Sequence, residues 1–254
     1  MSLFNFLKRN KGQEIPRPVL LVLVRHAESK RNAAKKGTTY FADEYARSQV
    51  KGIPDNKIPI TDLGWDQARK TGVYLKERFG MFDYIYNSGY LRTIETTEGI
   101  LEAYTKEEQG KIKVRENHFI RERHAGYTYD MTKEEAEGYF PWLPEYFKTH
   151  GGYIATPVGG ESLATVTQRV YTFINTLFRD RKEKKILVVT HGGTLRCFRA
   201  ILEHWNYDQA ESWAPGESPK NCGITVYTYD EEKGALKLEE HNTIAYEEAI
   251  SVHT

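Results

Sequence analysis

The chain has 254 residues, with 36 lysine and arginine residues against 35 aspartate and glutamate residues and a formal net charge of +1. This length suits one large α/β domain, or one domain with an inserted cap, and the balanced charge excludes a general basic field for nucleic acid. Two cysteines, Cys197 and Cys222, make neither a disulfide framework nor a zinc site by themselves.

Residues 1–18 precede the first patterned segment, and we expect them to form a mobile lead-in. Their apolar stretch, Leu3–Leu7, is too short for a signal peptide. No run of 18 apolar residues occurs in the chain, so no membrane span is predicted. We therefore expect a soluble, cytoplasmic protein, with a short amphipathic anchor at residues 1–18 as the alternative.

An unbroken apolar run, Val19–Val24, predicts a strand that is buried on both faces, as in a parallel sheet. Arg25 and His26 follow it directly. A cation and an imidazole at the carboxyl end of such a strand lie where open α/β sheets bind ligands. The polar residues 29–60 that come next are predicted to form a long irregular loop beside the site, of the kind that often contacts substrate.

A helix is predicted next, with Thr61 or Asp62 as its N-cap and Gly80 as its stop. A strand over residues 82–86 follows it. The apolar face of this helix is expected to include Leu63, Ala68, Val73 and Leu75.

Another helix is predicted after residue 89 and runs to about Tyr104, with Arg92 in its first turn. The helix dipole favours anions rather than cations at that end. A cation placed there makes sense if a bound anion lies beside it, and the alternative is an exposed surface arginine.

A short strand beginning at Lys113 is expected to lead to residues 119–120, after which Glu122 lies between two arginines. Residues from about 123 to 158 are rich in Tyr, Trp and Pro and show no regular period. They predict a cap of short helices inserted into a single domain, residues 19–254, rather than an independent domain.

The last third of the chain predicts a long helix from Ser162 to about Arg179 and then a second buried strand, Ile186–Thr190. His191 follows this strand directly. A helix over about 194–204, in which Cys197 is a core residue, and two closing strands, 224–229 and 236–238, complete the pattern.

Five polar residues end predicted strands, begin predicted helices or lie in the turns between them, and two arginines, two histidines and one carboxyl group suit a tetrahedral anion. Arginine offers forked donors for phosphate oxygens, and the start of a helix adds backbone N–H groups. A neutral imidazole can attack phosphorus, and a carboxylic acid can protonate the departing alkoxide. The five residues are Arg25, His26, Arg92, Glu122 and His191.

These residues resemble the motifs of the histidine phosphatase superfamily, which includes cofactor-dependent phosphoglycerate mutases and broad phosphatases. The family's Arg-His-Gly-Glu is similar to residues 25–28, where Ala27 replaces the glycine. The resemblance implies a three-layer α/β/α sandwich with a mostly parallel sheet and a small inserted cap. Further motifs of the family match residues 60–68, 88–96, 159–162 and 190–192 in the same order.

The resemblance also implies roles for single residues. His26 would be the phosphorylated nucleophile and Glu122 the proton donor, whereas Glu28 would be structural. No metal and no cofactor are implied, and the expected partner is a small-molecule phosphomonoester, not nucleic acid or a membrane, with oligomeric state left open. The phosphoryl oxygens would be held by Arg25, Asn32, Arg92, His191 and Gly192.

Within the family, the sequence favours a phosphatase over a phosphoglycerate mutase. Residues 121–126 resemble the mutase pattern Asn-Glu-Arg-His-Tyr-Gly, but Ala125 stands in place of the tyrosine. Phosphatases of plant and protist type have a related pattern, Arg-Glu-x-Asp-x-Gly. Because residues 121–126 otherwise resemble the mutase pattern, mutase activity remains the alternative.

Other classes of function fit less well. A serine hydrolase elbow would need a final glycine that residues 160–164 lack, and no Gly-x-Gly nucleotide fingerprint occurs. A metal hydrolase could use His26, His124 and His191, but Arg25 would repel a divalent cation. A phospholigand-binding protein without turnover is the remaining alternative.

Overall fold

The computed structural model describes residues 17–248, so the predicted lead-in lies outside the described residues except for Arg17 and Pro18. A six-stranded sheet with the order β3-β2-β4-β1-β5-β6 forms the centre of the molecule. The strands are β1 (Leu20–Arg25), β2 (Tyr84–Asn87), β3 (Lys113–Glu116), β4 (Lys185–Thr190), β5 (Ile224–Asp230) and β6 (Ala235–Thr243).

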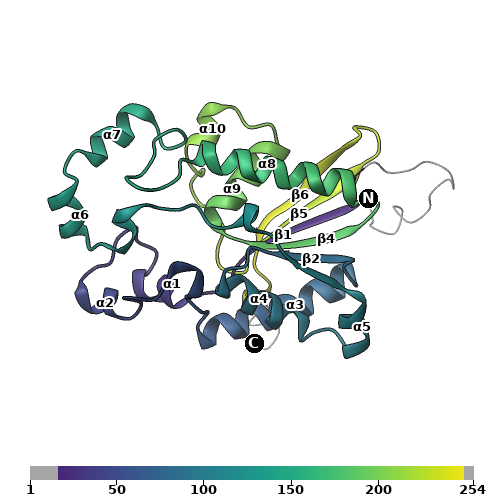
Figure 1. The fold of residues 1–254 in the computed structure, drawn as a ribbon. Helices are drawn as coiled ribbons and strands as arrows, with labels where there is room; N and C mark the ends of the chain where they lie inside the picture. Colours follow the sequence, from purple (N-terminus) through teal and green to yellow (C-terminus); the bar gives the residue numbers. More distant parts are fainter. Residues whose placement is uncertain (1–16, 249–254) are drawn as a thin grey trace.

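Helices cover both faces of this sheet (Figure 1). The 3₁₀ turns η2 (Asp55–Lys57), η3 (His118–Ile120) and η4 (Tyr127–Asp130) lie in the connections. The α-helices are α1 (Lys30–Lys35), α2 (Glu44–Ser48), α3 (Asp62–Phe79), α4 (Leu91–Leu101), α5 (Lys106–Lys111), α6 (Lys133–Tyr139), α7 (Leu143–His150), α8 (Leu163–Asp180), α9 (Gly192–Leu202), α10 (Tyr207–Glu211) and α11 (Ala245–Glu248).

The sheet is mostly parallel, as the sequence predicts. β1 pairs with β4 in parallel, and β2 pairs in parallel with both β4 and β3. Only β5 is antiparallel to both of its neighbours, β1 and β6. The two strands predicted to be buried, β1 and β4, therefore lie side by side at the centre, where helices shield both of their faces.

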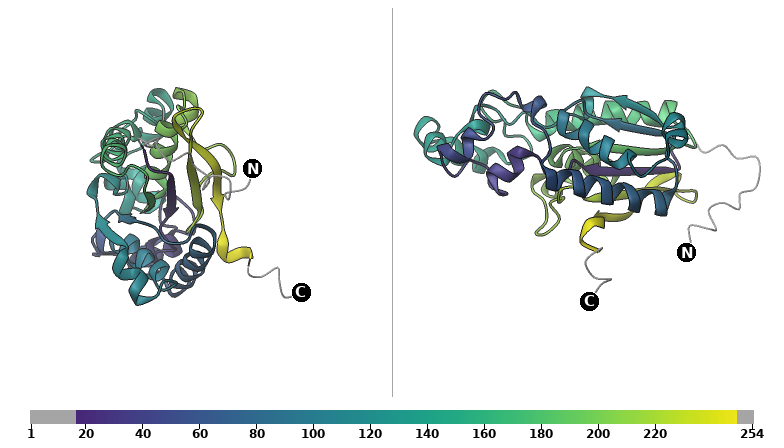
Figure 2. Two further views of the ribbon diagram at one scale, coloured as in Figure 1. Left: turned by 90° about the vertical axis from the view of Figure 1, so that its right-hand side faces the viewer. Right: turned by 90° about the horizontal axis from the view of Figure 1, so that it is seen from below.

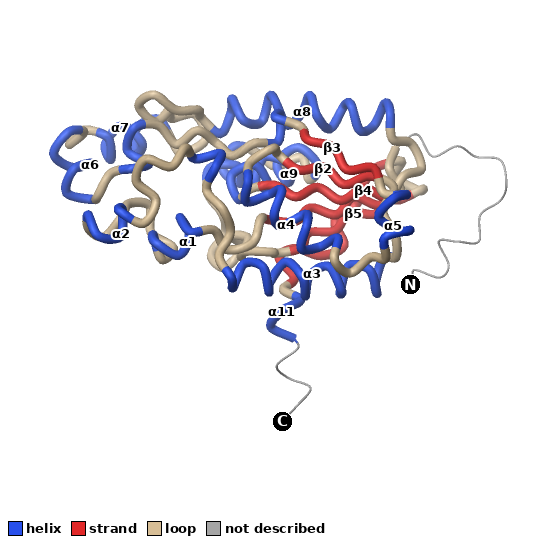
Figure 3. The backbone as a smooth tube through the Cα atoms, turned by 60° about the horizontal axis from the view of Figure 1, so that its bottom comes forward, coloured by secondary structure: helices blue, strands red, loops and turns tan. Residues whose placement is uncertain are grey.

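Alternate residues of the central strands pack into two separate apolar cores. Leu21 and Leu23 face one core with the buried residues of α8 and α9. Val22 and Val24 face the other core with the buried residues of α3 and α4. This alternation makes the three layers, and the layers are visible in the end-on view of Figure 2 and as red strands between blue helices in Figure 3.

Helix α3 begins and ends where its predicted caps are, with Thr61 accepting from the Gly64 amide and Gly80 following the last turn. The prediction for its apolar face is half wrong, because Leu63 and Val73 are 53% and 49% exposed. The helix also buries small and polar residues, of which Ala68 and Gly72 pack against α4. The buried set is Gly64, Gln67, Ala68, Thr71, Gly72, Leu75 and Phe79.

Residues 29–60 are not the irregular loop that their polar sequence predicts. They contain α1, α2 and η2, and side-chain caps stabilise the two α-helices, such as the reciprocal bonds between Ser29 and Asn32. These elements lie with α6 and α7 at one end of the molecule (Figures 1 and 3). A bridge between Phe41 and Thr132 and ion pairs of Arg31 with Asp130 join the two segments.

Residues 123–158 contain η4, α6 and α7. That these elements form an inserted cap stays a prediction. Within residues 17–248, no helix is both long and apolar enough to cross a membrane.

The close approach of α3 to α4 generates a stability prediction. A Cβ at Gly72 would lie 2.4 Å from the Ile100 carbonyl oxygen, which is backbone and cannot move aside cheaply. Gly72→Ala should therefore lower the free energy of unfolding by about 1–3 kcal/mol, the usual cost of overpacking. Urea unfolding followed by circular dichroism measures this change.

Gly138→Ala is the matched control, because Gly138 is an exposed helical glycine with open space around its Cβ position. Alanine there should be neutral or should stabilise by up to about 1 kcal/mol. Equal effects of the two substitutions would contradict the packing argument.

Candidate active site

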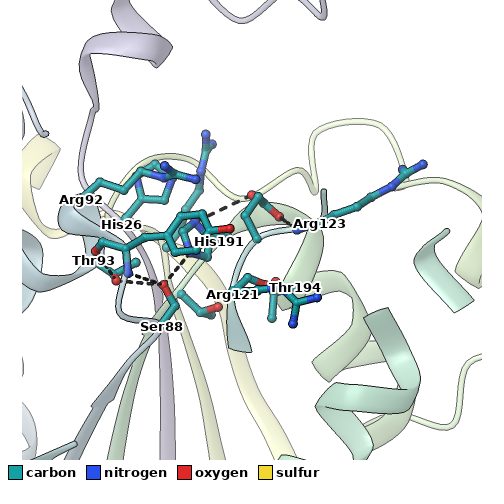
Figure 4. A network of polar contacts seen from close by, with 12 residues as sticks. His26, Ser88, Arg92, Thr93, Arg121, Arg123, His191 and Thr194 are labelled. Atoms are coloured by element: carbon teal, nitrogen blue, oxygen red, sulfur yellow. Dashed lines mark hydrogen bonds and ion pairs between the residues drawn. The ribbon is translucent and has the colours of Figure 1, made fainter. Parts of the chain in front are cut away.

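The pairing of β1 with β4 places the two strand-end histidines together. Arg25 lies opposite Thr190 in the register, and the His26 amide donates to the Thr190 carbonyl at 2.8 Å. The rings of His26 and His191 are consequently 5.2 Å apart, edge to face (Figure 4). The sequence prediction of one site built from both strands agrees with this geometry.

The neighbours of His26 determine which ring nitrogen is free. Its Nδ1 lies 2.7 Å from the Ala27 carbonyl oxygen, which can only accept, so Nδ1 carries the hydrogen. The Nε2 lone pair is then free for chemistry. Burial, and after it the charges of Arg92 and Arg25, hold the pKa of His26 well below its usual range, so the ring is neutral near pH 7.

His191 is completely buried at the start of α9. Its Nε2 lies 2.8 Å from the Ser88 hydroxyl oxygen (Figure 4), whereas its Nδ1 has no hydrogen-bond partner among the described residues. Burial, with the nearby positive charge of Arg92, holds the pKa of His191 well below its usual range. The ring is therefore neutral, with one polar nitrogen left for a ligand.

Arg92 lies in the first turn of α4, and its side chain extends beside the ring of His26 (Figure 4). It is buried, and its guanidinium donates to the Asp55 main-chain oxygen at 2.7 Å and to both carboxylate oxygens of Asp55 at 3.3 Å. Asp55 compensates the buried charge. The sequence did not predict this contact, because Asp55 lies far from Arg92 in the chain and in no regular element that the pattern predicted.

Arg25 is partly buried and donates through its NH1 group to the Pro219 carbonyl at 2.7 Å. Its Nε is buried with no hydrogen-bond partner among residues 17–248. Gly192 opens helix α9 next to it, because a Cβ at Gly192 would lie 3.8 Å from that Nε. The first amides of α9 have no acceptors within the helix, so this corner gathers N–H donors that suit an anion.

Glu122 reaches the site from the segment after η3. Its Oε2 lies 3.9 Å from His191 Nδ1, and its Oε1 accepts from the Arg123 amide at 2.8 Å. Its side chain is 20% exposed. Burial raises the pKa of Glu122, against the opposing effects of the Arg123 amide, Arg92 and Arg25. The carboxyl group therefore keeps its proton to a higher pH than an exposed glutamate does.

Two side chains hold the backbone around Glu122. The Arg169 guanidinium donates to the carbonyls of Phe119, Arg121 and Glu122 at 2.6, 2.8 and 3.1 Å. Thr194 on α9 also donates to the Arg121 carbonyl, at 2.7 Å. The carboxyl group therefore has little freedom to leave the histidines.

Asn32 joins the site through a residue that the sequence analysis missed. Asn221 donates to the His26 carbonyl at 2.9 Å and to Asn32 Oδ1 at 3.3 Å. Asn32 Oδ1 is also used by Ser29, so its amide nitrogen is the part left for a ligand. Asn221 lies in the irregular segment between α10 and β5, where no periodicity marks a functional side chain.

Other candidate residues have structural roles or poor reactivity. Glu28 accepts from the Thr61 hydroxyl at 2.8 Å and so supports the start of α3. Burial raises the pKa of the Cys197 thiol to about 11, so it stays protonated in the core. In the part of the chain that the structure describes, no group of three or more His, Cys, Asp or Glu residues is placed to hold a metal ion.

Comparisons with known proteins show the family of the chain. The model of the histidine phosphatase superfamily (branch 1) matches residues 21–242. A 2,3-bisphosphoglycerate-dependent phosphoglycerate mutase from Parvibaculum lavamentivorans is 30% identical over 227 residues, which are 87% of this chain and 96% of the relative.

Two solved structures show the same fold. YhfR from Bacillus stearothermophilus aligns with a TM-score of 0.69 and 22% identity, over 89% of this chain and 98% of its own. A mycobacterial glucosyl-3-phosphoglycerate phosphatase aligns with a TM-score of 0.66 and 19% identity, over the same shares of the two chains. With the family model spanning most of its length, the chain belongs to the histidine phosphatase superfamily.

Proposed function

We propose that the protein is a phosphomonoester hydrolase that acts on a small phosphorylated substrate through a phosphohistidine at His26. The observation that carries the proposal is the state of His26, a neutral ring whose Nδ1–H is used by the Ala27 carbonyl. Its Nε2 lone pair then lies among Arg25, Arg92 and His191, the groups that attract a tetrahedral anion.

In the first step, His26 Nε2 attacks the phosphorus and the bond to the ester oxygen breaks. Glu122 gives its proton to that oxygen, and the alcohol leaves. In the second step, water attacks the phosphohistidine while the Glu122 carboxylate takes up a proton from the water. Inorganic phosphate leaves, and His26 and Glu122 return to their starting states.

In this mechanism, Arg25 and Arg92 stabilise the charge on the phosphoryl oxygens throughout, and His191, Asn32 and the Gly192 amide add hydrogen bonds. Phosphoryl transfer depends mostly on such positioning and charge. We therefore infer turnover without a metal ion.

The first test concerns the nucleophile. Rapid acid-free quenching with a 32P-labelled aryl phosphate should trap a base-stable, acid-labile phosphoenzyme in the unaltered protein and none in His26→Ala, because the variant lacks the attacking nitrogen. His118→Ala, an exposed histidine outside the site, is the control and should be labelled normally. Labelling of His26→Ala would refute the assignment, and loss of labelling after EDTA treatment would refute the metal-free mechanism.

A second prediction concerns the acid. Glu122→Gln should slow hydrolysis of an alkyl phosphate by about 100- to 10,000-fold, the usual contribution of general acid catalysis. Hydrolysis of p-nitrophenyl phosphate should fall far less, because nitrophenolate leaves without a proton. Since the acid must be protonated, the rate with the alkyl ester should also fall as pH rises through the raised pKa of Glu122.

Glu28→Gln is the control for this comparison, because Glu28 is a carboxylate close in sequence to His26 that supports α3 instead. It should affect both substrates by the same factor. A selective loss with Glu28→Gln, or equal losses with Glu122→Gln, would show that Glu122 is not the proton donor.

The second candidate function is phosphoglycerate mutase activity, which the name of the Parvibaculum relative favours. A mutase returns the phosphoryl group to a second hydroxyl instead of to water. Ala125, in place of the tyrosine of the mutase pattern, favours the hydrolase.

Product analysis separates the two activities. With 3-phosphoglycerate and catalytic 2,3-bisphosphoglycerate, we expect little 2-phosphoglycerate, because the acceptor is water. Phosphate release from a panel of phosphorylated metabolites, measured on the same preparation, gives the reference rate. Isomerisation faster than every hydrolysis in the panel would establish the mutase.

A further inference from the structure

We propose that Ser88 and Thr93 are positioning residues that hold neutral His191 with its hydrogen on Nε2. The bare Nδ1 would then accept a proton when a tetrahedral dianion binds. The proposal rests on the proposed function only for the identity of that dianion as a phosphoryl group.

The contacts form a line from His191 to the main chain of α4, and Figure 4 shows its first members. His191 Nε2 lies 2.8 Å from Ser88 Oγ, and Ser88 Oγ lies 2.9 Å from Thr93 Oγ1. Thr93 Oγ1 lies 2.8 Å from the Tyr90 carbonyl oxygen. All three side chains are buried, so water does not replace any of these bonds.

The carbonyl at the end of the line sets the direction of every hydrogen. A carbonyl only accepts, so the Thr93 hydroxyl donates to Tyr90. Thr93 has one hydrogen, and it must therefore accept from Ser88. Ser88 has in turn used its own hydrogen, so it accepts from His191, whose Nε2 must carry one.

If every hydrogen bond in this line ran in the opposite direction, one buried donor would be left unpaired. Ser88 would donate to His191 Nε2, and the hydrogen of the neutral ring would move to Nδ1. That nitrogen is buried with no hydrogen-bond partner among the described residues, and the Glu122 carboxyl is 3.9 Å away. A buried N–H without an acceptor is more costly than an unused lone pair, so the line that ends at Tyr90 is favoured.

The opposite arrangement at His26 supports the same conclusion. His26 carries its hydrogen on Nδ1, donated to Ala27, and has its lone pair on Nε2. The two rings are 5.2 Å apart, and the nitrogen without a hydrogen is Nε2 in His26 but Nδ1 in His191. One lone pair is available to attack phosphorus, and the other is available to take up a proton.

The charged and polar groups around His191 explain why the proton comes only with the ligand. Cations outnumber the one carboxyl group, and burial adds to their effect, so the free ring stays neutral. A bound dianion, ROPO₃²⁻, reverses this balance. One proton from solvent then joins Nδ1, and the new N–H donates to a phosphoryl oxygen. The groups that face the ring are Arg25, His26, Tyr90, Arg92, Glu122 and Arg169.

Nitrogen-15 spectra of the histidine rings test the proposal directly, because protonated and bare ring nitrogens have well-separated shifts. In the free protein at neutral pH, we expect Nε2–H for His191 and Nδ1–H for His26, which is the internal reference. His191→Gln and His26→Ala assign the two sets of signals. A bare Nε2 on His191 in the free protein would overturn the proposal.

Substitutions then test the roles of the two hydroxyl groups. Ser88→Ala removes the acceptor and Thr93→Val removes the hydroxyl behind it, so both should shift His191 toward Nδ1–H. Turnover should fall about 10- to 100-fold, as is usual when a partner that orients a functional histidine is lost. Unchanged ring signals in both variants would overturn the roles.

Thr97→Val is the matched control, because Thr97 is a buried hydroxyl one turn further along α4 that donates to the Thr93 carbonyl. It should leave the His191 signals and turnover unchanged. If it shifts His191 as Ser88→Ala does, the effect is a general one of α4 and the proposal fails.

The bound state separates this proposal from the proposed function. Sulfate is a tetrahedral dianion that does not titrate near neutral pH. A proton taken up when sulfate binds must therefore lie on the protein and not on the sulfate. At saturating sulfate, we expect His191 to become doubly protonated, and failure to gain a proton would overturn the uptake. A protein without a phosphohistidine would still show these ring states, so the two proposals fail in different experiments.

Discussion

The parallel pairing of β1 with β4 is the constraint on which the site depends. It sets Arg25 opposite Thr190, the last residues of the two strands, so His26 and His191, which follow them, lie side by side at the same edge of the sheet. A slip of one residue would turn every side chain of β1 to the opposite core. Since Leu21 and Val22 are both completely buried, on opposite sides of the sheet, the apolar cores oppose such a slip.

Charge is the second constraint, and it explains several features together. Burial lowers the pKa of both histidines, and the charges of buried Arg92 and partly buried Arg25 lower it further. Buried charges need partners. Asp55 supplies one for Arg92, whereas Arg25 Nε is left without a hydrogen-bond partner among the described residues. Under the two proposals above, a phosphoryl dianion supplies the missing negative charge, and ligand binding and proton uptake are parts of one electrostatic balance.

The sequence predicted the features that have strong local patterns. The apolar runs of β1 and β4 and the caps of α3 lie where they were expected. The short helices α1 and α2 were missed because their stability comes from caps and from ion pairs with residues far along the chain. The buried face of α3 was misjudged because glycine packs there by close backbone approach. Asn221 was missed because its function depends on a tertiary contact with the His26 carbonyl.

The same geometry explains why hydrolases and mutases share this family. In the proposed mechanism, His26 and Arg25 at the end of β1, His191 at the start of α9 and Arg92 in α4 serve both activities in the same way. In the proposed mechanism, the activities differ only in the acceptor, which is water or a second hydroxyl group. The end of the molecule built from residues 30–58 and 127–150 adjoins the site through Asp55. Asp55 belongs to this end and binds Arg92 directly. Because Arg31 pairs with both Asp55 and Asp130, the two segments of that end are joined to each other and, through Asp55, to Arg92 of the candidate site.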